Sequence, residues 1–162
     1  MVDLRAMMAT FPTGVGIVTT VGSDALPRGM TCTSIASVAL EPPCLLICLR
    51  QGSPTLDAIL ESRGFALNLL RAEAQGTAEL FASGDPNRFG RVHWTKGPGA
   101  KGPHLADVAH TTADCRLLHL ISVGSHTVVF GEVIELTQRG DVRPLMYGMR
   151  EFTQWPDPAL LG

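Results

Sequence analysis

Four small hydroxyl residues and one thiol fall within residues 29–38, in the run Gly-Met-Thr-Cys-Thr-Ser-Ile-Ala-Ser-Val. The run is typical of a buried strand, and alternation would place polar groups on both of its faces. Because buried polar groups need hydrogen-bond partners, one interpretation is that a polar ligand lies against this strand. The alternative is an edge strand whose threonines face water, since Thr is a good strand former. The candidate ligand contacts in the run are Thr31, Cys32, Thr33, Ser34, Ala36 and Ser37.

A second group of residues has the chemistry of an anion site. Ser53 is a good N-cap and Pro54 fits the first position of a helix, so the free N–H groups there, with the Ser53 and Thr55 hydroxyls, can take a phosphate. Arg88, in a later loop, could add a second phosphate contact. The alternative is an ordinary capped helix, because this cap chemistry is common.

Two further polar residues lie on predicted strands. Asn68 lies inside the apolar run 65–70 and is either a satisfied core amide or a ligand contact. His126 begins a strand after the predicted hairpin turn at 124–125, where a ligand could reach it. The five histidines and four cysteines show no metal-ligand spacing, so we expect no metal site.

Composition limits the class of protein. A chain of 162 residues with 45% hydrophobic content predicts one domain spanning residues 1–162. The net charge of −2 and the scattered Lys and Arg argue against a nucleic-acid partner, which leaves a small molecule as the expected ligand. The N-terminal residues resemble no secretory signal, and no apolar run approaches the ~20 residues of a membrane span. We therefore expect a soluble, cytoplasmic protein with reduced cysteines.

The elements that must position these residues are mostly strands. Short helices are expected over 3–10, from 54 onward and over 73–82, and a surface loop over 97–103. Strands are expected at 15–21, along the hydroxyl-rich run, at 44–49 with both faces buried, and at 65–70, 114–123 and 126–136. This order predicts a mainly β protein with few short helices, and a closed or nearly closed β-barrel would remove its exposed edges.

Several motifs together resemble the short-chain NAD(P)H:flavin oxidoreductases, the reductase components of two-component flavin monooxygenases. The motifs run in order along nearly the whole chain: residues 11–15 (Phe-Pro-Thr-Gly-Val), 29–34 (Gly-Met-Thr-Cys-Thr-Ser), 40–43 (Leu-Glu-Pro-Pro), 53–55 (Ser-Pro-Thr), 68–70 (Asn-Leu-Leu) and 144–147 (Pro-Leu-Met-Tyr). Two positions depart from the family pattern, Thr33, where many members carry Asn, and Ser125, where Asp is frequent.

The resemblance implies a Greek-key split barrel that holds FMN or FAD, usually as a homodimer. It implies that the hydroxyl-rich strand lines the flavin ring and that Ser53, Thr55 and Arg88 hold phosphate. It also draws Asn68 and Tyr147, the only tyrosine, into the cofactor site and places His126 beside the nicotinamide of NADH or NADPH. Reduced flavin would then pass to a separate monooxygenase. A flavin-dependent oxidase of the pyridoxamine-phosphate oxidase type and a non-catalytic flavin-binding module remain as alternatives.

Overall fold

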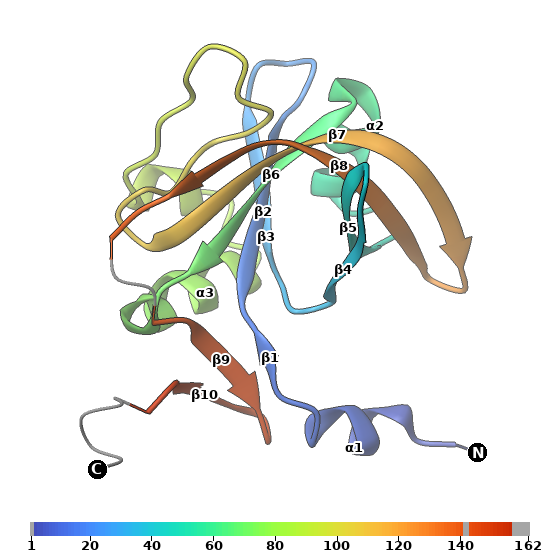
Figure 1. Ribbon diagram of the computed structural model, residues 1–162, viewed down its shortest axis with the longest axis vertical. Helices are drawn as coiled ribbons and strands as arrows, with labels where there is room; N and C mark the ends of the chain where they lie inside the picture. Colours follow the sequence, from blue (N-terminus) through green and yellow to red (C-terminus); the bar gives the residue numbers. More distant parts are fainter. Residues whose placement is uncertain (1, 141–142, 157–162) are drawn as a thin grey trace.

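The main body of the protein is a curled seven-stranded antiparallel sheet. In the computed structural model, which describes residues 2–140 and 143–156, the strand order is β3-β2-β6-β7-β8-β5-β4 (Figure 1). The strands are β2 (Gly16–Val21), β3 (Pro27–Cys32), β4 (Ile35–Leu40), β5 (Pro43–Arg50), β6 (Gly64–Leu70), β7 (Ala109–Val123) and β8 (His126–Gln138). This sheet confirms the predicted mainly β class.

The sheet is brought round into a barrel by a very short connection. β3 and β4 are the two outermost strands, yet only Thr33 and Ser34 separate them in the chain. The Cys48 N–H of β5 donates to the Ser34 carbonyl at 3.1 Å, so this turn holds the two edges of the sheet close together. The hydroxyl-rich run is therefore two strands and a turn, and the single alternating strand expected over 29–38 is wrong.

A second, smaller sheet lies below the barrel in Figure 1 and consists of β1 (Thr13–Gly14), β9 (Leu145–Gly148) and β10 (Glu151–Gln154). Helix α1 (Leu4–Ala9) lies beside it, and the Met149 N–H donates to the Ala9 carbonyl at 2.6 Å. Residues from both ends of the chain therefore meet under one end of the barrel.

Two longer helices cover other parts of the sheet. Helix α2 (Pro54–Ser62) begins where predicted, with the Ser53 Oγ accepting from the Leu56 N–H at 3.3 Å, and buries Leu56 and Ile59. Helix α3 (Gln75–Ala82) follows the short 3-10 turn η1 (Ala72–Ala74), and a second such turn, η2 (Arg88–Arg91), lies in the long loop that precedes β7. No helix among the described residues is long and apolar enough to cross a membrane.

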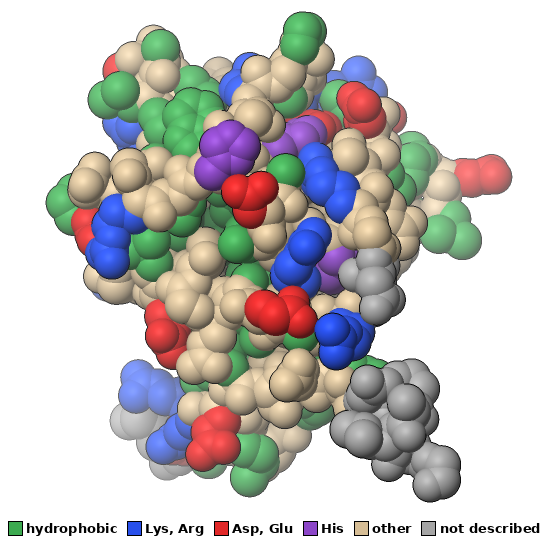
Figure 2. Space-filling view, turned by 90° about the vertical axis from the view of Figure 1, so that its left-hand side faces the viewer, with side chains coloured by type: hydrophobic (Ala, Val, Ile, Leu, Met, Phe, Trp, Pro, Cys, Tyr) green, Lys and Arg blue, Asp and Glu red, His purple; other side chains and the backbone are tan. Residues whose placement is uncertain are grey.

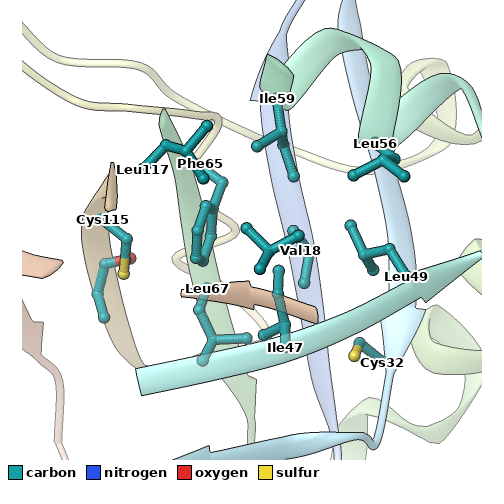
Figure 3. Close-up of a cluster of buried hydrophobic side chains, with 12 residues drawn as sticks. Val18, Cys32, Ile47, Leu49, Leu56, Ile59, Phe65, Leu67, Cys115 and Leu117 are labelled. Carbon is teal, nitrogen blue, oxygen red and sulfur yellow. The ribbon is translucent and has the colours of Figure 1, made fainter. Parts of the chain in front are cut away.

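The core consists of two apolar clusters. The larger one fills the barrel under α2 with Val18, Ile47, Leu56 and Phe65 among its members (Figure 3). The smaller cluster, which includes Leu70, Phe81 and Leu145, joins α3 to the small sheet. Together they fix the barrel relative to the small sheet that supports its lower end.

Two expectations for buried and exposed segments are wrong. β5 is not buried on both faces: Ile47 and Leu49 face the core, whereas Leu46 and Cys48 are only half-buried. The loop 97–103 is not simply a surface loop, because the Pro103 carbonyl accepts from the Thr19 Oγ1 at 2.6 Å and so is buried in the core. The apolar composition of β5 predicted burial on both faces, and the Gly/Pro content of 97–103 predicted an exposed loop. Neither pattern contains information on which distant side chains contact these segments.

Candidate functional site

A cleft of about 740 Å³ lies between the barrel and the small sheet. Its walls are the β3–β4 turn, the start of β4, the outward face of β5, helix α1 and the two turns of the small sheet. The residues lining it are Arg5, Met8, Ala9, Phe11, Thr13, Thr33, Ser34, Ile35, Ala36, Leu46, Cys48, Tyr147 and Arg150. Most of these residues are apolar, and the polar ones include three hydroxyl residues and two arginines.

The β3–β4 turn offers main-chain donors to the cleft. The Ser34 carbonyl accepts from β5, whereas the N–H groups of Thr33 and Ser34 donate no hydrogen bond to any described residue. Strand pairing ends at Cys32 and resumes at Ile35, which leaves these groups outside the ladder. Two neighbouring free N–H groups beside an apolar wall can hold the carbonyl edge of a flat ring.

A hydroxyl in the opposite wall also lacks a partner. The Thr13 Oγ1 is buried and forms no hydrogen bond within the described residues. Thr13 pairs with Tyr147 across β1 and β9, and the Tyr147 ring is held by Phe152 at a centroid distance of 5.0 Å. Because a buried polar atom without a partner is unfavourable, the Thr13 hydroxyl is well placed to bond a ligand or a water molecule in the cleft.

The cleft face continues along β5 and β8. Leu46, Cys48 and Arg50 alternate onto one side of β5, and in the antiparallel register His126 lies directly opposite Arg50. Arg50 also leads into the turn that ends at Ser53, the N-cap of α2. One face of the sheet therefore connects the cleft to the start of α2 and to His126.

The thiols differ in environment. Burial raises the pKa of Cys32 to about 11 and that of Cys115 to about 12, and both belong to the barrel core. The half-buried Cys48 lines the cleft, and burial raises the pKa of its thiol as well. All four cysteines are free, and among the described residues no group of His, Cys, Asp and Glu has the arrangement of a metal site.

The structure brings four of the expected cofactor residues together in the cleft, namely Thr33, Ser34, Ala36 and Tyr147. Ser53, Thr55 and His126 do not line it. Ser53 caps α2, Thr55 is buried in the first turn of that helix, and the exposed His126 bonds its Nδ1 to the Ser125 Oγ at 3.0 Å. The Arg50 to His126 pairing and the hydrogen bond from the Gln51 N–H to the Ser125 carbonyl at 2.9 Å place the chain just before Ser53 beside His126.

Four further expected residues lie elsewhere. Thr31 donates to the Ala78 carbonyl of α3 at 2.6 Å, Cys32 belongs to the core, and Ser37 is exposed on β4 outside the cleft. Arg88 lies in η2, whose Phe89 packs on Phe81 of α3. Thr31, Cys32 and Ser37 do not share one strand as expected, because the run divides at Thr33.

Asn68 is a core amide and not a ligand contact. It is fully buried, and its Nδ2 lies within 3.2 Å of the Ile17 carbonyl, the Thr19 Oγ1 and the Pro103 carbonyl. Its Oδ1 accepts from the Leu105 N–H at 2.9 Å and from a threonine hydroxyl of β7. Every hydrogen-bonding atom of the amide is therefore engaged by the protein, which removes Asn68 from the candidate site.

Sequence reasoning missed much of the cleft lining. Arg5, Met8 and Arg150 come from opposite ends of the chain and carried no local signal. Phe11 and Thr13 lie in a motif noted at the sequence level without a role, and Cys48 was taken for a core thiol. The pairing of β1 with β9 and the contact of Met149 with Ala9 bring the residues from the two ends of the chain to one place, and the bond from the Cys48 N–H to the Ser34 carbonyl adds Cys48.

Comparison with known proteins gives a consistent result. Residues 8–156 match the family described as flavin reductase like domain. A flavin reductase (NADPH) of Lentzea aerocolonigenes is 45% identical over 153 residues, covering 94% of this chain and 89% of that protein. The reductase subunit HsaB of a flavin-dependent monooxygenase from Rhodococcus jostii is 36% identical, covering 92% of this chain and 75% of that protein.

A solved structure agrees with the fold. The NADH:FAD oxidoreductase of Streptomyces globisporus, determined with NAD and FAD fragments, superposes with a TM-score of 0.89 at 32% identity and covers 98% of each chain. The match extends over the barrel, the small sheet and the cleft between them.

Proposed function

Because the chain belongs to the flavin reductase like family, we propose that it is an NAD(P)H:flavin oxidoreductase that reduces FMN or FAD with NADH or NADPH. The observation that carries this proposal is the cleft at the β3–β4 turn, which combines an apolar wall, two free N–H groups and the unpartnered Thr13 hydroxyl. A flat heterocycle with polar edges fits this set of groups. We further propose that residues 1–162 act as one domain in the cytoplasm, consistent with four free cysteines.

The residues of the chain would bind and orient, while the bound flavin supplies the hydride-accepting chemistry. The N–H groups of Thr33 and Ser34 would hold the polar edge of the ring and stabilise negative charge there. Ala36 and Leu46 would line one side of the ring, and Tyr147 with Met8 the other. The chemistry that a bound flavin would supply, acceptance of a hydride from a nicotinamide, requires no general base of the protein.

We assign the flavin phosphate to the start of α2. A ligand that lies along Leu46 and Cys48 would reach Arg50 and then Ser53 and Thr55. There the positive end of the helix dipole, the Ser53 hydroxyl and the Thr55 N–H, which donates no hydrogen bond within the described residues, favour an anion. Replacing Ser53 and Thr55 by Ala should weaken FMN and FAD about tenfold more than riboflavin, since charge-assisted hydrogen bonds are lost only for the phosphorylated ligands. Equal weakening of all three flavins would place the phosphate elsewhere.

We keep His126 as the candidate nicotinamide contact. It lies at the end of the cleft face opposite Arg50, and its exposed ring is bonded within the described residues only through Nδ1, to the Ser125 Oγ. His126→Ala should raise the KM for the nicotinamide donor or lower the hydride-transfer rate, with little change in melting temperature. Unchanged donor kinetics would remove His126 from the site.

We propose that the protein is a homodimer. Across β7 and β8, Ile121 pairs with Val128 and His119 with Phe130, so these side chains continue the cleft face as a partly exposed apolar surface. A second copy packed on this face would cover it and complete the open side of the cleft. Ile121→Glu should dissociate the dimer in sedimentation and weaken flavin binding, whereas Leu26→Glu, in the exposed turn before β3, should do neither. A wild-type monomer with full flavin affinity would refute the dimer.

The product would be used elsewhere. As in the monooxygenase whose reductase subunit is similar to this chain, we propose that reduced flavin passes to a separate monooxygenase. No nucleic-acid partner is proposed, since the face in Figure 2 carries basic and acidic side chains interspersed.

The activity is tested with the purified protein and each of FMN, FAD and riboflavin, by following the absorbance of NADH and of NADPH. Flavin-dependent loss of absorbance under anaerobic conditions is the expected result. Binding of flavin with no oxidation of either donor would instead favour a non-catalytic flavin module. Oxidation of a bound amine in place of NAD(P)H would favour an oxidase of the pyridoxamine-phosphate type.

A further inference from the structure

Two arginines stand at the cleft without acidic partners. Arg5 of α1 and Arg150, between β9 and β10, both line the cleft, and both are exposed. Neither forms a salt bridge within the described residues, although Asp3 and Glu151 are close to them in sequence. Asp3 instead uses its carboxylate to cap α1. Their guanidinium groups are therefore available to an anionic ligand.

The two arginines are held on one structural unit. The Met149 N–H donates to the Ala9 carbonyl, which ties the turn carrying Arg150 to the end of α1. Arg150 has a left-handed backbone with φ +64°, so its side chain leaves a tight turn that is itself fixed between two strands. A pair of guanidinium groups on adjoining rigid segments suits a compact dianion better than a diffuse charge.

The Arg5 and Arg150 pair lies apart from the proposed phosphate site at Arg50 and the start of α2. Helix α2, which follows shortly after Arg50 at the end of β5, lies at the upper side of the barrel in Figure 1, whereas α1 and the small sheet lie below it. The proposed reaction needs two phosphate-bearing ligands, and the flavin phosphate is assigned to α2. The lower pair therefore falls to the nicotinamide donor.

The chemistry of the lining distinguishes between the two donors. An arginine guanidinium binds a phosphate dianion through two parallel hydrogen bonds, and in Rossmann folds arginine holds the 2′-phosphate of NADPH, whereas a carboxylate accepts from the 2′-hydroxyl of NADH. The described residues that line the cleft include two arginines and no Asp or Glu. We infer that Arg5 and Arg150 bind the 2′-phosphate of NADPH and make this chain prefer NADPH over NADH; this rests on the proposed function.

The kinetic test uses Arg5→Gln, Arg150→Gln and the matched control Arg116→Gln, which removes an exposed arginine of β7 that is paired with Glu132 of β8. Each cleft variant should lower the ratio of kcat/KM for NADPH to that for NADH about tenfold, as expected for one charge-assisted contact, and the control should leave the ratio unchanged. Lysine at either position should restore part of the preference, because it keeps the charge but not the planar fork.

A binding test does not depend on turnover. Calorimetry with 2′,5′-ADP and with 5′-AMP should show tighter binding of 2′,5′-ADP by the wild type, and both glutamine variants should lose that difference. An unaltered NADPH to NADH ratio in both variants, or an effect confined to the KM for FMN, would overturn the assignment. If the wild type oxidised neither donor, the proposed function would fail, while the 2′,5′-ADP titration would still decide whether the arginines bind this phosphate.

Discussion

Replacing Asn68 by Ala should destabilise the protein without a direct effect on the flavin site. The change leaves the Leu105 N–H buried without an acceptor and removes the Nδ2 bonds to the Ile17 carbonyl, the Thr19 Oγ1 and the Pro103 carbonyl. The orphaned N–H costs about 2 kcal/mol and the remaining lost bonds about 1 kcal/mol more, because the Pro103 carbonyl keeps the Thr19 hydroxyl. The free energy of unfolding should therefore fall by about 3 kcal/mol.

Thermal melting measures the effect. For a chain of this length a loss of about 3 kcal/mol corresponds to a fall in Tm of roughly 6–12 °C. Asn87→Ala, at an exposed asparagine of the loop before β7, is the matched control and should change the free energy of unfolding by less than about 0.5 kcal/mol. Flavin affinity, measured well below the Tm, should be close to wild type in both variants. A large loss of flavin affinity in Asn68→Ala with an unchanged Tm would refute the core assignment and return Asn68 to the site.

Three further predictions concern the thiols, the pH dependence and the packing. Cys48 should react with iodoacetamide before Cys32, because burial raises the pKa of Cys32 to about 11. Bound FMN should protect Cys48 from labelling, since Cys48 lines the cleft; equal labelling with and without FMN would show that the flavin does not cover Cys48. Burial, with a nearby arginine, lowers the pKa of His110. Below about pH 6.5 the unfolded state therefore binds more protons than the folded state, and the free energy of unfolding decreases as the pH decreases. Between melts at about pH 7.5 and about pH 5.5, the Tm of His110→Asn should fall less than that of the wild type. Gly131→Ala should lower the free energy of unfolding by about 1–3 kcal/mol, since the added Cβ would lie 2.6 Å from the ring of a core phenylalanine. Gly76→Ala in helix α3 should raise the Tm, because no other atom lies within 4 Å of the added Cβ.

Local chemistry was enough to predict some parts of the fold. The Ser53 cap and Pro54 placed the start of α2, because an N-cap is decided by neighbouring residues. Gly124, with φ +56°, marked the hairpin between β7 and β8 for the same reason. The β-rich composition and the order of motifs predicted the barrel.

The site itself depends on contacts that no local pattern records. The break at Thr33 occurs where the chain crosses from one edge of the sheet to the other, and alternation alone cannot show such a crossing. Asn68 meets Leu105, 37 residues further along, so a core role and a ligand role look the same in sequence. Arg5 and Arg150 come together only because the small sheet pairs the two ends of the chain.

The two-residue connection between β3 and β4 also limits how the chain can be lengthened. Extra residues at Thr33 and Ser34 would let the outermost strands separate and would expose their unpaired edges to other chains. An epitope tag or reporter peptide inserted there should cause aggregation as well as loss of binding. The tip at 124–125, which joins two neighbouring strands, can be extended without parting the edges of the barrel. The turn proposed to hold the ligand thus also joins the two edges of the barrel, where changes of length are tolerated least.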